Sequence, residues 1–143
     1  MKIRLALAVN SSLMFDQNYF ADAEQFLIYE WNNQEFNVLE SFPNPLKQLP
    51  NPTSVAERYH LLIHFLHEQN ISILVANRFS ENLKSINDSF VPVLVNSSSP
   101  EDLFPVLQKR MRWIEEEWLE NAGHYKLFNL QRGALKTAVS NNC

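Results

Sequence analysis

Short apolar segments of strand length dominate the first forty residues. Residues 2–9 alternate at their start, where Lys2 and Arg4 flank Ile3, continue as an apolar run and lead into the turn-prone residues 10–12, which predicts a strand followed by a loop. Two asparagines separate the aromatic and β-branched run 25–31 from the alternating run 35–40, as is typical of a hairpin. Four prolines within residues 42–52 then predict an irregular connection, because proline disrupts both helix interiors and central strands.

Helical and strand patterns alternate after this connection. Apolar spacing predicts a helix that is capped by Thr53 or Ser54 and ends near Glu68. Its expected buried stripe is Val55, Tyr59, Leu62 and Leu66. Residues 71–76 are continuously apolar, which is typical of a buried parallel strand, and residues 80–86 fit a short helix. We expect residues 91–95 to form an edge strand, because Pro92 cannot donate a ladder hydrogen bond.

A long second helix is predicted from residue 99 onward. Ser99 and Pro100 resemble a helix start, but Pro105 leaves two alternatives: a short 3₁₀ turn before a helix capped by Asp102, or a kinked helix. Gly123 is a natural stop for this helix. Its expected buried face consists of Leu107, Met111, Ile114 and Trp118.

The order of elements is therefore β β β α β α β α. This order predicts a three-layer α/β fold around a mixed five-stranded sheet, with an antiparallel hairpin on one side and parallel crossovers on the other. We expect one domain over residues 1–121. Residues 122–143 have weak periodicity and are interpreted as a C-terminal extension.

Composition and charge narrow the range of possible functions. The 143 residues are 45% hydrophobic, which fits one globular domain. All sixteen acidic side chains lie at or before Glu120, and the net charge is −4, so nucleic-acid binding is disfavoured. No apolar run is long enough to span a bilayer, and the start of the chain lacks a secretory signal pattern, so we expect a cytoplasmic protein that binds no membrane.

Cysteine and glycine usage excludes several kinds of site. Cys143 is the only cysteine, so neither an intrachain disulfide nor a four-thiolate iron–sulfur site can form. Gly123 and Gly133 are the only glycines, so neither glycine-rich phosphate-binding fingerprint is present. The first predicted strand contains no acidic residue for a metal-dependent nuclease. We therefore expect no catalytic residue and a protein that is not an enzyme.

Three histidines form the sharpest chemical pattern in the sequence. His60, His64 and His67 are spaced at i, i+4 and i+7 on the first predicted helix. They fit either the polar boundary of an amphipathic helix or a metal site, and the latter would permit a metal-dependent hydrolase. The glutamate of an HExxH motif is absent, because Leu61 follows His60. We assign no metal ligand from this pattern.

Two segments carry a family resemblance that extends over residues 1–112. Residues 16–30, which include Asp-Gln-Asn-Tyr-Phe-Ala-Asp and Phe-Leu-Ile-Tyr-Glu, and residues 73–83 resemble the dinitrogenase iron–molybdenum cofactor biosynthesis family. The resemblance implies a ribonuclease H-like fold and a non-catalytic carrier of the cofactor or its iron–sulfur precursor. The family histidine falls on Tyr19, or on Asn18 after a one-residue shift. Family glycines fall on Ala21, Asn77 and Ser80.

The resemblance also implies a ligand site at the loops that follow the strands. Its expected residues are Ser11, Ser12, Asn18, Tyr19, Asn77 and Arg78. Tyr19 and Asn18 would contact the ligand, and Arg78 would offset its negative charge. The implied partner is a nitrogenase assembly protein or a second copy of the chain. The alternative function is a protein-interaction or chaperone-like module without cofactor, which would use the acidic body and the segment from Trp113 onward.

Overall fold

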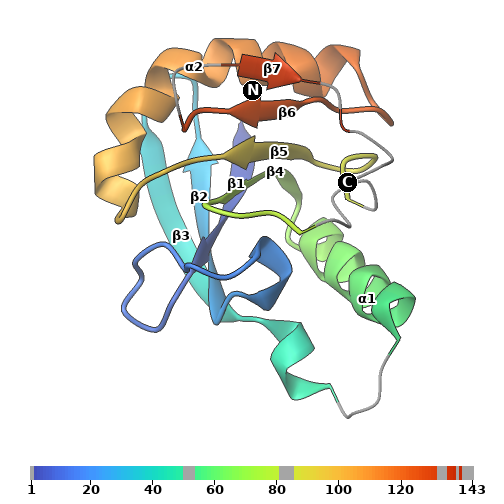
Figure 1. The fold of residues 1–143 in the computed structure, drawn as a ribbon. Coiled ribbons are helices and arrows are strands. Elements are labelled where there is room, and N and C mark those ends of the chain that lie inside the picture. Colours follow the sequence, from blue (N-terminus) through green and yellow to red (C-terminus); the bar gives the residue numbers. More distant parts are fainter. Residues whose placement is uncertain (1, 50–53, 81–85, 132–134, 138, 140–143) are drawn as a thin grey trace.

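Seven strands within the described part of the chain form one mixed sheet in the order β3-β2-β1-β4-β5-β6-β7 (Figure 1). The structure is a computed structural model that describes residues 2–49, 54–80, 86–131, 135–137 and 139. The strands are β1 (Ile3–Val9), β2 (Gln25–Trp31), β3 (Phe36–Pro43), β4 (Ile71–Ala76), β5 (Val91–Leu94), β6 (Leu127–Asn129) and β7 (Leu135–Thr137). The prediction of five strands is therefore wrong, because the C-terminal segment contributes β6 and β7.

The pairing directions confirm the predicted division of the sheet. β1 pairs antiparallel with β2, and β2 pairs antiparallel with β3, so the predicted hairpin is present. β1, β4, β5 and β6 pair in parallel, whereas β7 returns antiparallel to β6. The register of the β2–β3 pair shifts between Ile28 and Tyr29.

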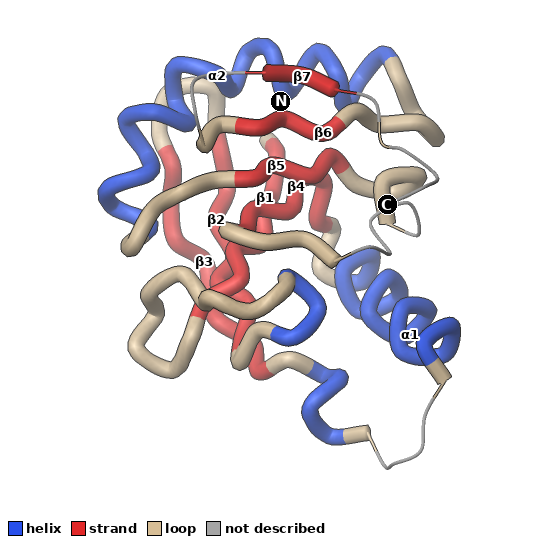
Figure 2. Tube along the Cα trace, viewed as in Figure 1, coloured by secondary structure: helices blue, strands red, loops and turns tan. Residues whose placement is uncertain are grey.

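The two α-helices of the described residues cover opposite faces of this sheet. α1 (Val55–Glu68) packs on one face and α2 (Pro100–Glu120) on the other, as Figure 2 shows. Two 3₁₀ turns, η1 (Phe20–Asp22) and η2 (Pro45–Gln48), lie in the connections that flank the hairpin. Neither α1 nor α2 combines the length and apolar character that a helix needs to cross a bilayer.

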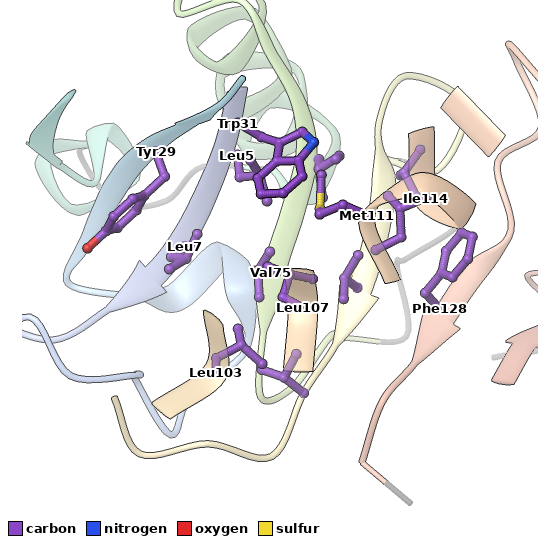
Figure 3. Packing of buried hydrophobic residues seen from close by; sticks show 14 of the residues in the cluster. Leu5, Leu7, Tyr29, Trp31, Val75, Leu103, Leu107, Met111, Ile114 and Phe128 are labelled. Atoms are coloured by element: carbon purple, nitrogen blue, oxygen red, sulfur yellow. The ribbon is translucent and has the colours of Figure 1, made fainter. Parts of the chain in front are cut away.

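Alternation along the strands divides the core into two layers. Leu5 and Leu7 of β1 face α2, whereas Ala6 and Ala8 face α1, because successive side chains of a strand point to opposite faces. The α2 layer is the larger of the two and holds much of the aliphatic core, part of which is visible in Figure 3. Its helix contributes Leu103, Leu107, Met111 and Ile114.

The first helix largely follows its sequence pattern. Ser54 is its N-cap and accepts a hydrogen bond from the Glu57 N–H at 3.1 Å, and the helix ends at Glu68 as predicted. Leu62 and Leu66 are fully buried and Tyr59 partly so. Val55 is 57% exposed, so its predicted place in the buried stripe is wrong; as the first helical residue it lies beyond the part of α1 that packs on the sheet.

The second helix runs through Pro105 without interruption. Ser99 caps it and accepts a hydrogen bond from the Asp102 N–H at 3.3 Å, so the alternative start capped by Asp102 is wrong. Three of the four predicted core positions are fully buried, and Trp118 is partly buried. Asn121 ends the helix, and Gly123 follows with a φ of +93°, which glycine adopts at low cost.

The fifth strand lies inside the sheet, so its predicted edge position is wrong. Pro92 pairs with β4 opposite Leu74, but the β6 ladder begins only at Val93. Pro92 thus lies outside the β5–β6 ladder, where its missing N–H costs no hydrogen bond. The short helix predicted at residues 80–86 falls largely on residues 81–85, which lie outside the described part of the chain.

Candidate functional site

The rim at the carboxyl ends of β1 and β4 is the candidate site. These two strands are parallel neighbours, so the loops that follow Val9 and Ala76 leave the sheet at the same edge. Loops in this position are the usual place for a ligand in an α/β sheet. Most of the residues that the sequence places in the site lie on these two loops.

Asn10 shapes the first of these loops. Its Oδ1 accepts hydrogen bonds from the Ser12 N–H at 2.9 Å and the Met14 N–H at 3.1 Å, and Leu13 takes a positive φ of 61°. Ser11 and Ser12 are exposed. The Ser12 amide is already used within the loop, so it is not available to a ligand.

A buried carboxylate fixes the rest of that loop. Asp16 is only 4% exposed, and its two oxygens accept hydrogen bonds from the Asn18 N–H at 2.8 Å and the Glu24 N–H at 3.1 Å. Asp16 is therefore a buried acceptor for the backbone of the loop rather than a solvated surface acid. By bridging two backbone amides, this residue holds the segment on which Tyr19 lies.

Tyr19 and Arg78 contact each other at the rim. The Arg78 guanidinium lies 4.5 Å from the centroid of the Tyr19 ring, and its Nη2 donates a hydrogen bond to the Tyr19 hydroxyl at 3.3 Å. Below them the Phe20 N–H donates to the Arg78 carbonyl at 2.9 Å. The Phe20 and Phe79 rings stack with centroids 5.8 Å apart, so the chain neighbours of both site residues are anchored.

The charge of Arg78 is not neutralised within the described part of the chain. No ion pair joins it to a carboxylate there, and its side chain is exposed. Stacking on a tyrosine ring holds the guanidinium without removing its charge. The pair can therefore present a positioned positive charge, with the remaining guanidinium N–H groups available as donors.

Asn77 has a positioning role rather than a ligand-facing one. Its Nδ2 donates to the Ser97 carbonyl at 2.9 Å, and its Oδ1 accepts from the Ser97 N–H at 3.2 Å. Gln131 Nε2 donates to the carbonyls of Asn77 at 3.1 Å and Val95 at 3.0 Å. The C-terminal segment thus reaches the rim, which no signal in the sequence indicated.

The structure brings together only part of the predicted site. Tyr19 and Arg78 touch, and Asn77 and Asn18 lie next to them in the chain, with the Asn18 N–H bound to Asp16. Among the described residues, no hydrogen bond joins Ser11 or Ser12 to Tyr19 or Arg78. Sequence reasoning missed Asp16, Phe20, Phe79 and Gln131 as positioning residues.

The two tryptophans of α2 pack within the molecule. The Trp113 ring meets Phe128 of β6 edge to face at 4.9 Å, and Trp118 stacks on Tyr125 at 5.2 Å. These contacts attach the C-terminal segment to α2. The predicted interaction surface from Trp113 onward is therefore used, in these two places, for contacts inside the chain.

The three histidines of α1 separate into a pair and a single residue. His60 and His64 border one hollow of about 570 Å³ beside the helix, together with Ala56, Glu57 and Leu61. The His67 ring instead lies 4.9 Å from the Phe90 ring. No group of three or more side chains suited to a metal ion occurs among the described residues.

No protein-family model matches the chain, and no curated protein matches it significantly.

Proposed function

We propose that this protein is a non-catalytic binding protein that holds an anionic ligand at the Tyr19–Arg78 rim. The ligand class implied by the resemblance is the iron–molybdenum cofactor or its iron–sulfur precursor, carried as cargo. The observation that carries the proposal is the stacked guanidinium of Arg78 at the carboxyl ends of β1 and β4, which has no ion-pair partner within the described part of the chain.

Preorganisation of the rim supports a binding role. Asp16 fixes the loop of Tyr19 through two backbone amides, and Asn77 and Gln131 fix the loop of Arg78. A charged group that is already held in place loses less conformational freedom when a ligand arrives. The strand order β3-β2-β1-β4-β5 further supports assigning the core to the ribonuclease H-like class.

The donor groups at the rim favour charge contact over metal coordination. A phenol and an amide, from Tyr19 and Asn18, are poorer ligands for soft metal centres than imidazole or thiolate. Arg78 supplies a planar set of N–H donors that suits anionic oxygen groups. We therefore propose that a metal cluster would be held through its anionic periphery rather than through a bond from this rim to iron.

Anaerobic binding of the isolated cofactor, or of its precursor, tests the proposal. The full chain is incubated with the cluster and separated by gel filtration, and iron and molybdenum are measured in the protein fraction. We expect comigration with the native chain and a loss of retained iron of about tenfold in Arg78→Ala, the scale of about 1.4 kcal/mol for one lost charged contact. Arg78→Lys keeps the charge but not the planar donors, so it should retain an intermediate amount.

Arg112→Ala is the matched control. Arg112 is also exposed, but it lies on α2, where its Nε is 3.9 Å from Glu116 Oε1. Removal of the Arg112 side chain should leave cluster retention unchanged. Native protein that retains no iron would contradict the carrier proposal. Equal retention by the native chain and Arg78→Ala would contradict the assignment of the site.

A further inference from the structure

A pair of histidines on α1 forms a second constellation that the rim does not use. His60 and His64 lie one helical turn apart, and both border the same hollow of about 570 Å³. Residues at i and i+4 have Cβ atoms roughly 5–6 Å apart, a spacing that lets two imidazoles reach one ion. Both side chains are exposed, so an ion can reach them from solvent.

The structure separates this pair from the other two histidines. The His67 ring packs at 4.9 Å from Phe90, tilted by 34°, and is therefore engaged with an aromatic neighbour. His124 lies beyond α2, outside the residues that border the hollow. The three-histidine pattern of the sequence is thus reduced to two candidate ligands.

Two carboxylates accompany the pair along the helix. Glu57 borders the same hollow one turn before His60. Glu68 lies one turn after His64, and its Oε1 is 3.0 Å from His64 Nε2. A carboxylate bound to one ring nitrogen fixes the orientation of an imidazole and leaves the other nitrogen for a metal, an arrangement that recurs around metal-bound histidines.

We propose that His60 and His64 form a surface site for a divalent transition-metal ion of the zinc or nickel type. Imidazole is a preferred ligand of these ions. The described residues offer no third converging ligand, so water completes the coordination and the ion remains exchangeable. Glu57 and Glu68 add negative charge on either side of the pair. This site is independent of the proposed function at the rim.

Titration of the metal-free full chain with ZnCl₂ or NiCl₂, followed by calorimetry, tests the proposal. We expect saturable one-to-one binding together with a rise in the thermal midpoint, because an ion that binds only the folded helix stabilises it. His60→Ala and His64→Ala should each weaken binding at least about tenfold, since even loss of an outer-shell partner costs roughly 10- to 100-fold. Glu68→Gln should weaken binding by a smaller factor.

Matched variants make the test decisive. His67→Ala and His124→Ala each remove an imidazole outside the pair, and Glu116→Gln removes an exposed glutamate of another helix; all three should leave the affinity unchanged. Absence of saturable binding by the native chain would overturn the proposal. Undiminished binding by the double variant His60→Ala with His64→Ala would also overturn it. In all variants, an unchanged far-ultraviolet circular dichroism spectrum shows that the fold is intact.

Discussion

Glu117 shows how one buried charge joins distant parts of the chain. Its side chain is 0% exposed, and its two oxygens accept hydrogen bonds at 2.8 Å from Lys136 Nζ, Asn121 Nδ2 and the Lys126 N–H. Lys136 also lies 5.9 Å from the ring centroid of Trp113. A buried carboxylate needs such partners, because burial without them costs several kcal/mol.

These partners determine the titration of Glu117. Burial by itself would raise the pKa of its carboxyl group, but the hydrogen bonds from Lys136, Lys126 and Asn121, with the charge of Lys136, outweigh burial and hold the pKa below its usual value. A carboxyl group with a lowered pKa in the folded state stabilises the fold above its unfolded-state pKa. That contribution is lost as the pH falls through the lower, folded-state value.

We expect Glu117→Gln to destabilise the protein at pH 7 by roughly 3 kcal/mol, the scale for breaking a buried charged pair. The variant leaves the Lys136 ammonium without its carboxylate. Urea unfolding at pH 7 and at pH 3 measures the effect, and the difference from the native chain should shrink at the lower pH. Glu116→Gln, an exposed change on the same helix, should stay within about 0.5 kcal/mol of the native chain. A pH-independent difference would contradict this account.

At the scale of elements, the loop between β1 and β2 shows how one side chain can hold the backbone of a whole segment in place. This loop contains η1 and carries Tyr19, yet Asp16 alone bonds both the Asn18 and the Glu24 N–H. Backbone amides that lose their acceptor inside a structure cost free energy, whereas exposed ones turn to water. The shape of the rim therefore depends on a residue that does not face the ligand.

Asp16→Ala should lower the free energy of unfolding by about 1–3 kcal/mol, because two amides lose their acceptor. Retention of the cluster at Arg78 should fall as well, since Tyr19 is no longer held beneath the guanidinium. Urea unfolding and the gel-filtration assay measure the two effects. Glu24→Ala, an exposed carboxylate of the same loop, should change neither. Full stability of Asp16→Ala would show that the loop is held by other contacts.

At the scale of the whole molecule, the C-terminal segment is part of the sheet. β6 pairs with β5, and Phe128 of β6 is fully buried against Trp113. Gln131 extends from the same segment to the rim. This arrangement argues against independent folding of residues 1–121. Removing the segment would expose the edge of β5 and the core beneath Phe128.

Deletion of residues 122–143 should lower the thermal midpoint strongly and broaden the unfolding transition, since it removes two strands and their buried contacts. Phe128→Ala should have a thermal midpoint between those of the native chain and the deletion variant. It should lower the free energy of unfolding by about 3–5 kcal/mol, the usual range for a buried phenylalanine. Circular dichroism on heating measures both variants. Leu119→Ala, at an exposed position of α2, should behave as the native chain. An unchanged midpoint after deletion would establish residues 1–121 as an autonomous domain.

Local periodicity accounts for the elements that the sequence predicts correctly. The hairpin, the buried strand β4 and the caps Ser54 and Ser99 depend on residues close together in the chain, where spacings of 2.0 and 3.6 residues reveal which face is buried. Within the candidate site, the resemblance named Tyr19 and Arg78 but could not show that they touch. The resemblance also named Ser11 and Ser12. The Ser12 amide is not free to bind a ligand, because it donates its hydrogen bond to Asn10 within the turn.

The sequence by itself determined the α/β character, the parallel and antiparallel halves of the sheet and most of the core positions of α1 and α2. Tertiary structure alone decided the contact of Tyr19 with Arg78 across 59 residues, the interior place of β5 and the burial of Glu117. The physical reason is the range of the interactions. Hydrophobic periodicity depends on residues that are close together in the chain. A polar residue or an edge strand, in contrast, acquires its partner only when distant segments pack together.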